Sequence, residues 1–408
     1  MIYKFDGYEL DLDLFELRRD GERVAVEPQV FDVLAYLVEH RARVVEKNEL
    51  LDAVWKTTFV TESALTSRIK AARRALRDDG QSQRTIRTLH GRGYRFVAPV
   101  EVLVNPDVGS SGSSPRSEGR IAVSQEIRFC RSADGAQVAY ASSGDGPPLV
   151  KAAHWLTHLD YDWESAVWRH WLRELSRHHR LVRSDERGCG LSDSEIEALS
   201  LETKVADLEA VVDACGLDRF GLLGVSGGGP ASVAYAARHP DRVSRLVLYG
   251  AFARGRMVRA RTIEERREAE LMVDLAELGW GRDDPAFRHV FALQFMPNGT
   301  PEQWSAFDEL QRRTASPANA ARIMAATMQL DVVELAPLVT APTLVIHARG
   351  DRRIPLEEGR RLAALIPDSR LVILDSSNHI LQRDEPAWER FVDELHAFLR
   401  PGSGSLAG

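Results

Sequence analysis

Hydrophobic and polar positions alternate with two different periods along the first sixty residues. Between Leu10 and Val26, short apolar runs alternate with charged residues around a turn at Asp20-Gly21, which predicts a small antiparallel sheet. From Pro28 onward, apolar side chains recur every three or four residues, which predicts a helix with one buried face. Its inward positions are Phe31, Leu34, Leu37 and Val38, and those of a second predicted helix are Leu50, Leu51 and Val54.

A third predicted helix, from Glu62 to Leu76, has two chemically different faces. Thr61 can cap its N-terminus. The buried stripe recurs at steps of four and three and consists of Leu65, Ile69, Ala72 and Leu76. Short polar and basic side chains are expected to project outward together: Ser63, Thr66, Ser67, Lys70, Arg73 and Arg74. A helix with these two faces suits the major groove of DNA.

Basic residues continue after this helix into a predicted hairpin. Two β-like runs, 85–89 and 94–97, flank His90-Gly91-Arg92-Gly93, so the tip carries an arginine between glycines that can enter a minor groove. Residues 63–100 hold nine Lys/Arg against two Asp, whereas residues 1–62 hold eight basic and fourteen acidic side chains. Such a positive block indicates a polyanion-binding face, and a solvated helix surface is the alternative.

The second part of the chain has the pattern of an α/β sheet. From Ile127 onward, short β-like runs alternate with helical sequence. These runs are 127–130, 137–141, 149–153, 180–183, 220–225, 243–249, 343–347 and 371–374. Residues 252–335 interrupt the alternation with helical sequence only, which we interpret as a helical lid inserted after the strand at Val243. The Gly/Ser-rich stretch 103–120 predicts a flexible linker between domains at 1–102 and 121–401.

One turn in this second part carries a candidate nucleophile. The strand predicted at 220–225 leads into Gly224-Val225-Ser226-Gly227-Gly228, and a helix follows from Pro230. Strand, sharp turn and helix is the context in which a G-x-S-x-G motif exposes a reactive serine. An idle serine in a Gly-rich turn is the alternative. Asp351 and His379 favour a catalytic role for Ser226. Each follows a predicted strand, at the edge of an open α/β sheet where catalytic and ligand-binding residues lie.

Composition narrows the class of protein. A chain of 408 residues with 44% hydrophobic and 28% charged side chains predicts two or three soluble globular domains. Its three cysteines are far apart, in no metal or disulfide pattern, which fits the reducing cytoplasm. The N-terminus is not a signal peptide, and the longest uncharged run, 220–237, is broken by glycines and a proline. We therefore expect a cytoplasmic protein that binds no membrane, no metal and no cofactor.

Several other side chains receive ordinary structural interpretations. His178 and His179 end a predicted helix and are expected to be solvated, and His347 is expected in the core. The predicted lid is rich in aromatic and thioether side chains. We expect most of these to pack the lid itself, and some to line an apolar pocket over Ser226.

The first hundred residues resemble the OmpR/PhoB-type winged-helix effector domain. The resemblance rests on residues 27–34, 49–55 and 86–96, the last of which ends in Gly-Arg-Gly-Tyr-Arg-Phe. It covers about residues 3–100 and implies a recognition helix at 62–76, with His90 and Arg92 also directed at DNA. It further implies a loop at 55–61 that touches RNA polymerase in the family. No phospho-receiver domain is recognisable, so we expect a signal other than aspartyl phosphate to set activity.

Residues 126–400 resemble the α/β-hydrolase superfamily. The motifs are residues 185–193, Asp207-Leu208, the turn at Ser226, residues 239–243, 351–355 and Asn378-His379. The resemblance implies Ser226 as nucleophile, His379 as general base and Asp351 as its orienting carboxylate, in the chain order of that superfamily.

The resemblance also implies an oxyanion hole made of the N–H groups of Gly227 and Trp155. One departure concerns the second donor. Relatives carry His-Gly after the third strand, whereas this chain has Ala153-His154 before Trp155, a change that can reshape the oxyanion loop.

We therefore expect a one-component transcriptional regulator of mixed α/β class. An N-terminal winged helix-turn-helix would bind double-stranded DNA, and a C-terminal α/β-hydrolase fold with a helical lid would bind and hydrolyse a small apolar ester- or lactone-like compound. In the alternative, the hydrolase fold is only a non-catalytic ligand sensor that controls DNA binding, which His154 favours. The expected partners are DNA, RNA polymerase, the small molecule and a second copy in a homodimer.

Overall fold

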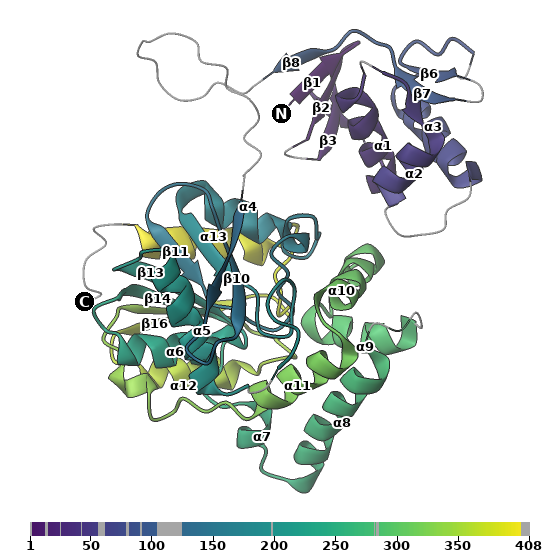
Figure 1. The fold of residues 1–408 in the computed structure, drawn as a ribbon. Helices are drawn as coiled ribbons and strands as arrows, with labels where there is room; N and C mark the ends of the chain where they lie inside the picture. Colours follow the sequence, from purple (N-terminus) through teal and green to yellow (C-terminus); the bar gives the residue numbers. More distant parts are fainter. Residues whose placement is uncertain are drawn as a thin grey trace, which may run out of the picture. The chain divides into compact units, whose positions relative to one another are not determined.

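The computed structural model divides the chain into two compact units, Met1–Glu118 and Gly119–Gly408 (Figure 1). The residues described are 2–12, 15–24, 26–41, 43–55, 62–78, 81–89, 92–103, 125–196, 199–280, 282 and 285–400. Three predictions fall outside these ranges: the cap at Thr61, nearly all of the loop at 55–61, and the linker from residue 104 to 120.

The first unit begins with an antiparallel sheet of five strands in the order β4-β3-β2-β1-β8. The strands are β1 (Ile2–Phe5), β2 (Tyr8–Asp11), β3 (Glu16–Arg19), β4 (Glu22–Val24) and β8 (Glu101–Leu103). Alternate side chains of β1, Tyr3 and Phe5, are buried, so one face of the sheet packs on the core. The end of the unit returns to its beginning, because β8 pairs with β1 and places Val102 opposite Tyr3.

Three helices and a smaller sheet complete this unit. The helices are α1 (Pro28–Glu39), α2 (Lys47–Trp55) and α3 (Glu62–Ala75), and the strands are β5 (Val45–Glu46), β6 (Ile86–Leu89) and β7 (Gly93–Phe96), paired as β5-β7-β6. Leu34 and Leu37 of α1 are fully buried, and the predicted stripe of α3, from Leu65 to Leu76, is buried against them in the same cluster. The predicted buried faces of α1 and α3 are therefore confirmed.

A buried carboxylate fixes the connection between α3 and the hairpin. Asp78 accepts the backbone N–H groups of Arg84, Thr85 and Ile86 at 2.9, 2.9 and 3.1 Å. Burial raises the pKa of Asp78, but these hydrogen bonds outweigh it, so the pKa lies below its ordinary value. The charged carboxylate therefore holds the first strand of the hairpin against the end of α3.

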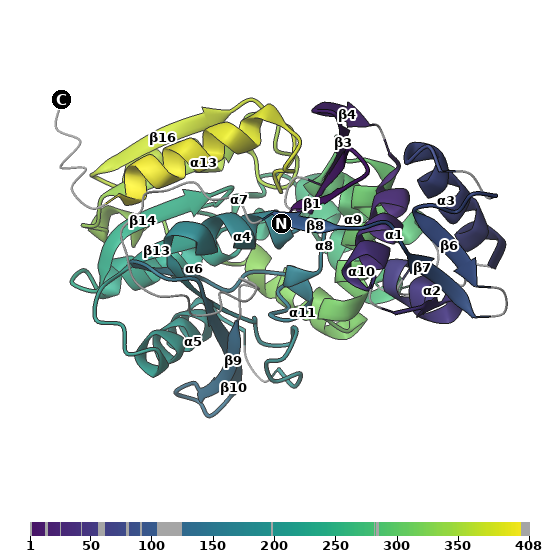
Figure 2. The ribbon, with the colours of Figure 1, turned by 90° about the horizontal axis from the view of Figure 1, so that it is seen from above.

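The second unit is built on an eight-stranded sheet in the order β16-β15-β14-β13-β11-β12-β10-β9. Its strands are β9 (Glu126–Arg131), β10 (Gln137–Ser143), β11 (Pro148–Lys151), β12 (Arg180–Ser184), β13 (Phe220–Val225), β14 (Val243–Tyr249), β15 (Thr343–Ala348) and β16 (Ser369–Leu374). β10 is antiparallel to both neighbours, and the other pairs are parallel. Figure 2 shows β16 and β9 at opposite edges. Every predicted strand of this unit is present.

Helices cover both faces of the sheet, because successive strand residues point to opposite sides (Figure 1). Leu223 and Val225 join the cluster that contains α4 (Arg169–His178) and α13 (Pro386–Leu399). Leu222 joins the cluster that contains α5 (Leu201–Ala214), α6 (Gly228–Arg238) and α12 (Leu356–Leu365). The result is a three-layer sandwich in which loops, not helices, cover the edge at the carboxyl ends of the parallel strands.

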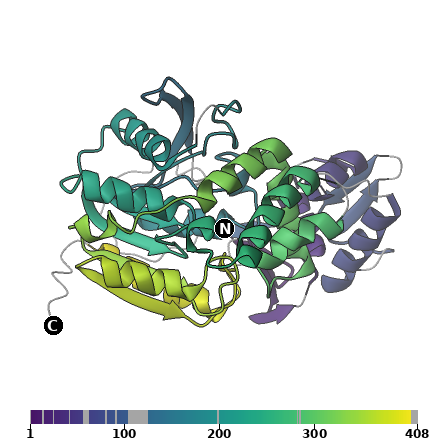
Figure 3. The same ribbon diagram turned by 90° about the horizontal axis from the view of Figure 1, so that it is seen from below.

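A helical insertion follows β14 and is drawn in green in Figure 3. It comprises α7 (Arg256–Arg259), α8 (Ile263–Gly279), α9 (Pro285–Phe295), α10 (Pro301–Thr314) and α11 (Pro317–Met328). Hydroxyl side chains cap three of these helices: Thr262 for α8, Thr300 for α10 and Ser316 for α11. Phe291, Phe307 and Met324 are buried within it, as expected for side chains that pack the lid. Among the described helices, none has the length and apolar character needed to cross a membrane.

We expect Asp78→Ala to loosen the hairpin, because the buried N–H groups of Thr85 and Ile86 would lose their acceptor at a cost of about 1–3 kcal/mol. Hydrogen exchange at residues 85–89 of the variant should be roughly 10- to 100-fold faster at pH 7. Since folding lowers this pKa, the contribution is complete above the unfolded Asp value of ~3.9 and is lost as pH falls through the folded pKa.

The control is Ser82→Ala, which removes a longer hydrogen bond, of 3.3 Å, to the same carboxylate. Unchanged exchange in Asp78→Ala, or equal effects of the two variants, would contradict the proposed role of the carboxylate.

Candidate functional site

The turn at Ser226 joins the end of β13 to the start of α6. Ser226 has φ +48°, a left-handed conformation that a non-glycine residue adopts only when its surroundings hold it there. Its N–H donates to the carbonyl of Tyr249 at 2.9 Å. A side chain on Gly229 would put a Cβ 2.4 Å from that of Ala251, so the helix could not start so close to the sheet. The predicted strand–turn–helix context is therefore present, with Ser226 partly exposed at its apex.

Asp351 and His379 form a direct contact at the same edge of the sheet. His379 Nδ1 lies 2.6 Å from Asp351 Oδ2, and both side chains are buried. The other oxygen, Oδ1, accepts the N–H groups of Arg353 and Ile354 at 2.8 and 2.9 Å. Burial raises the pKa of Asp351, but the charge and hydrogen bond of His379 outweigh it and leave the pKa below its ordinary value. The carboxylate therefore stays ionised and orients the imidazole.

Gly250 brings the imidazole next to the serine turn. β13 and β14 pair Val225 with Tyr249, so Ser226 and Gly250 leave the sheet side by side. Gly250 has φ +54°, and a Cβ there would lie 3.0 Å from His379 Cε1. His379 Nε2 is buried, and within the described part of the chain it has no hydrogen-bond partner. An imidazole with Nδ1 on a carboxylate and Nε2 unpartnered can accept a proton at Nε2.

The predicted second oxyanion donor belongs to the segment after β11. A Cβ on Gly228 would lie 2.8 Å from the carbonyl oxygen of Ala153, so this segment touches the start of α6. His154 is buried, and its Nδ1 lies 2.7 Å from the carbonyl oxygen of Trp155. Burial, and then the charge of Lys151, keep the pKa of His154 well below its ordinary value, so the ring is neutral. The Trp155 ring packs on Trp280 at 5.1 Å, which ties the segment to the lid.

A buried polar cluster lies behind this segment and explains part of the motif at 185–193. Asp185 Oδ2 accepts the N–H groups of Leu159 and Leu191 at 3.1 and 2.9 Å. Arg183 Nη1 donates to Asp162 at 2.9 Å. Burial raises the pKa of Asp185 to about 7 and that of Asp162 to about 6, and it lowers the pKa of Lys151 to about 7. The cluster therefore fixes the loops after β11 and β12.

His347 and His179 illustrate two other predictions. His347 is fully buried in β15, with Nε2 at 2.9 Å from the carbonyl oxygen of Ile354, which confirms the core assignment. His179 is only 6% exposed, so the expectation of a solvated ring is wrong for this residue. Its imidazole stacks on His396 of α13, a neighbour that the local sequence does not reveal.

Three side chains on α4 and α13 could hold a metal ion, a grouping that sequence reasoning missed. Glu174, His178 and His396 each offer one ligand atom, and these atoms lie within 4.8 Å of one another. Glu174 and His178 are four residues apart on one helix, a spacing that could have suggested the pair. In the structure, His396 Nε2 instead lies 3.1 Å from Glu174 Oε1 and forms a hydrogen bond with it.

The outward face of α3 shows most of the predicted DNA-binding residues. Thr66, Ser67, Lys70 and Arg74 are exposed on it, and Arg92 is exposed on the hairpin. The side chain of Ser63 and all of His90 lie outside the described residues.

Arg73 does not project outward with its predicted neighbours. Its guanidinium donates to the carbonyl of Ile86 and the hydroxyl of Thr88, both at 2.8 Å. The side chain therefore links α3 to β6. The reason is geometric, because the hairpin packs beside the last turns of α3 and offers acceptors that a helical pattern cannot reveal.

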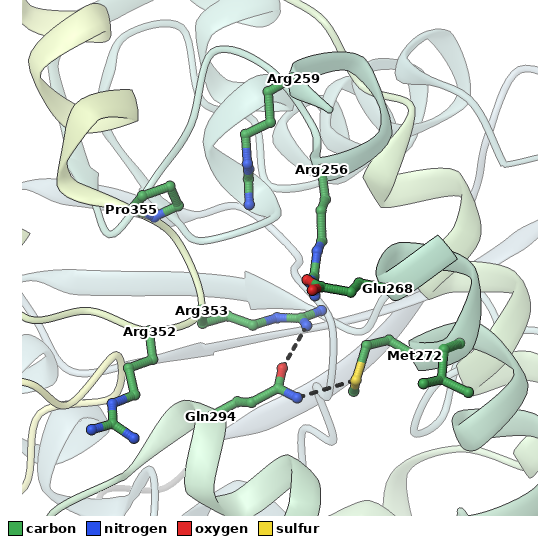
Figure 4. A pocket seen from close by; sticks show the side chains of 9 residues that line it. Arg256, Arg259, Glu268, Met272, Gln294, Arg352, Arg353 and Pro355 are labelled. Atoms are coloured by element: carbon green, nitrogen blue, oxygen red, sulfur yellow. Dashed lines mark hydrogen bonds and ion pairs between the residues drawn. The ribbon is translucent and has the colours of Figure 1, made fainter. Parts of the chain in front are cut away.

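A charged cavity of about 440 Å³ opens between the lid and the loop after β15 (Figure 4). Its lining comprises Arg256, Arg259, Glu268, Leu271, Met272, Gln294, Arg352, Arg353 and Pro355. This cavity differs from the apolar pocket expected over Ser226, because four of its lining side chains are arginines. Sequence reasoning missed it, since the residues come from segments up to about a hundred positions apart.

Each of the two parts of the chain matches a known protein family. Residues 159–386 match the model of the alpha/beta hydrolase fold family, and residues 21–96 match that of the family described as transcriptional regulatory protein, C terminal.

The pyrrolizixenacetamide deacetylase of Xenorhabdus hominickii is 28% identical over 268 residues, which are 65% of this chain and 95% of the relative. The transcriptional regulator HilA of Salmonella typhi is 41% identical over 104 residues, which are 26% of this chain and 18% of HilA. The crystal structure of the esterase RhEst1 from Rhodococcus sp. ECU1013 matches with a TM-score of 0.54 and 27% identity, over 67% of this chain and 98% of the esterase.

The chain therefore belongs to the α/β hydrolase fold family and carries an OmpR/PhoB-type winged-helix domain at its N-terminal end.

Proposed function

We propose that the chain is a one-component transcriptional regulator whose C-terminal unit is a serine hydrolase. The observation that carries the proposal is the contact of 2.6 Å between His379 Nδ1 and Asp351 Oδ2, with Nε2 buried and unpartnered beside the turn of Ser226. The similarity to a deacetylase and to an esterase supports hydrolysis of an ester or a related carbonyl compound.

The proposed reaction follows from the chemistry of these groups. Ser226 Oγ attacks the carbonyl carbon while His379 Nε2 takes the hydroxyl proton, and Asp351 stabilises the imidazolium that results. The N–H groups of Gly227 and Trp155 would stabilise the oxyanion. The imidazolium then gives its proton to the leaving group, and water releases the acyl group from Ser226 by the same steps in reverse order. No cofactor enters this scheme.

A second candidate function is a ligand sensor without turnover. The specific observation that favours it is His154, whose buried ring holds the Trp155 carbonyl at the position where relatives carry glycine. A sensor of this kind would shift DNA binding only if its ligand had unequal affinity for the two states.

The N-terminal unit would bind double-stranded DNA through α3 and the hairpin. Lys70 and Arg74 are the exposed basic side chains of the predicted recognition face, and Arg92 extends the positive surface to the hairpin. Contacts to RNA polymerase and a homodimer are further parts of the proposal, taken from the resemblance to the winged-helix family.

We expect Ser226→Ala to reduce hydrolysis of p-nitrophenyl butyrate by up to ~10⁶-fold in kcat, because the three side chains act as a unit. Release of p-nitrophenolate under initial-rate conditions measures the effect. The matched control is Ser305→Ala, an exposed serine on α10, which should leave kcat/KM unchanged.

Undiminished turnover in Ser226→Ala would refute the enzymatic proposal. If the unaltered protein itself leaves the ester intact at the uncatalysed rate while a ligand still changes its DNA binding, the sensor function is supported instead.

We expect Lys70→Ala and Arg74→Ala each to weaken binding to a random 30-base-pair duplex and to lower the slope of log K against log salt by ~1, since each would remove one phosphate contact. Fluorescence anisotropy between 50 and 200 mM salt measures both quantities. Arg128→Ala, an exposed arginine on β9, is the control and should leave the slope unchanged. A duplex affinity that is insensitive to salt would count against the DNA-binding role.

A further inference from the structure

The cavity beside the lid is a concentration of positive charge that the proposed hydrolysis does not by itself explain. Arg256 and Arg259 line it from α7, and Arg352 and Arg353 from the loop after β15; the Arg352 guanidinium points away from the other three (Figure 4). Among the residues that line it, Glu268 is the one carboxylate, and it lies 3.1 Å from Arg256. The lining therefore carries a clear excess of positive charge.

Two of these guanidinium groups have only neutral partners. Arg353 Nη1 donates to the side-chain oxygen of Gln294 at 3.1 Å, and Arg259 Nη1 donates to the backbone oxygen of Arg254 at 3.2 Å. Among the described residues, no carboxylate oxygen lies within 4.0 Å of either group. Burial, and then the charges of Arg256 and Arg259, lower the pKa of Arg353 to about 10. The charge of Asp351 acts in the opposite direction on Arg353, and the charges of Glu358 and Asp351 do so on Arg259, but neither carboxylate lines the cavity. An anion in the cavity would further offset the cost of holding these guanidinium groups together.

Arg353 also connects the cavity to the candidate catalytic groups. Its backbone N–H donates to Asp351 Oδ1, so the residue is part of the loop that holds the carboxylate. Its guanidinium carbon lies 5.3 Å from the ring centre of Trp155 and 5.2 Å from that of Phe295. The Phe295 ring in turn lies 5.4 Å from the ring of His379, and its carbonyl accepts the His379 N–H. A single aromatic side chain therefore separates the guanidinium from the imidazole.

We infer that the arginine cavity binds an anionic group of the substrate, and that the substrate is an ester-like carbonyl compound bearing a carboxylate away from the scissile bond. A planar carboxylate matches the paired donors of a guanidinium, and a volume of about 440 Å³ accommodates such a group with a short chain. The inference rests on the proposed hydrolase function and replaces the purely apolar substrate that the lid composition suggests.

The test compares two p-nitrophenyl esters of similar length, mono-p-nitrophenyl glutarate and p-nitrophenyl pentanoate. Each reaction consumes one water and releases p-nitrophenolate with the free acid. The protein should prefer the glutarate by at least about tenfold in kcat/KM, and Arg353→Met should reduce that preference by about 10- to 100-fold, chiefly through KM. Hydrolysis of the pentanoate is the reference within each variant, so a general effect of the change on the loop of Asp351 cancels in the ratio of the two esters.

The matched control is Arg360→Met, an exposed arginine on α12 that does not line the cavity, and it should keep the full preference. Arg256→Met offers a second variant from the lid side should Arg353→Met fail to fold. A pair with the carboxylate on the leaving group, 3-acetoxybenzoate against phenyl acetate, shows which side of the scissile bond carries the charge. Equal rates within both pairs would overturn the inference while leaving the hydrolase proposal intact.

A binding measurement separates the two proposals. Glutarate should bind Ser226→Ala in calorimetric titration, and the additional Arg353→Met change should weaken that binding by at least about tenfold. If no ester is hydrolysed yet glutarate binds in this arginine-dependent way, the proposed enzyme function fails and the anion site stands. Glutarate binding that ignores Arg353 and Arg256 would overturn the anion site.

Discussion

The parallel pairing of four neighbouring strands is the constraint on which the candidate site depends. β13 to β16 are parallel neighbours, so their carboxyl ends meet at one edge, and residues 226, 250, 351 and 379 all lie in the segments that leave this edge. Asp351 and His379 are 28 positions apart in the chain. Their contact therefore depends on the pairing of β15 with β16, which brings the two loops together. Gly250 shows how tight the arrangement is, because any side chain there would meet the imidazole. A shift of one strand by one residue would therefore separate the groups and turn each side chain of that strand to the opposite face of the sheet.

Buried charged groups fix the loops after β11 and β12 at the carboxyl edge of the sheet, at a considerable desolvation cost. The buried cluster contains Asp162, Arg183 and Asp185. Burial raises the pKa of Asp162 to about 6 and that of Asp185 to about 7. Hydrogen bonds to backbone N–H groups compensate part of that cost, since Asp185 holds Leu159 and Leu191 at once. The stabilising effect thus lies less in net free energy than in fixing one conformation of the loops. The residues that follow Trp155 are held by the same cluster, because Asp185 binds the Leu159 N–H and the Glu186 N–H donates to the Thr157 hydroxyl.

The sequence predicts the sheet well because most strands of the second unit are short apolar runs between polar turns. Ser226 follows β13 directly, and Asp351 and His379 come three and five positions after the ends of β15 and β16, so the prediction of a triad rests on equally local signals. Contacts between segments that are distant in the chain cannot be recognised from the local sequence pattern. The outward position of Arg73 in the helical pattern gave no hint of its bond to the Ile86 carbonyl, and His179 carried no mark of its stacking on His396. The arginine cavity is the extreme case, because only the folded lid brings Arg256 beside Arg353.

The position of the cavity indicates that a bound anion would affect the contact between the lid and the loop after β15, in addition to its role in substrate binding. Its arginines come from two segments that are far apart in the sequence, α7 of the lid and the loop after β15. Without an anion, the charge of Arg256 acts on Arg353 across the cavity and contributes to the lowered pKa of Arg353. An anion between them would attract both guanidinium groups and so link α7 to the loop that carries Asp351. Hydrolysis that frees the anionic fragment would remove this link again.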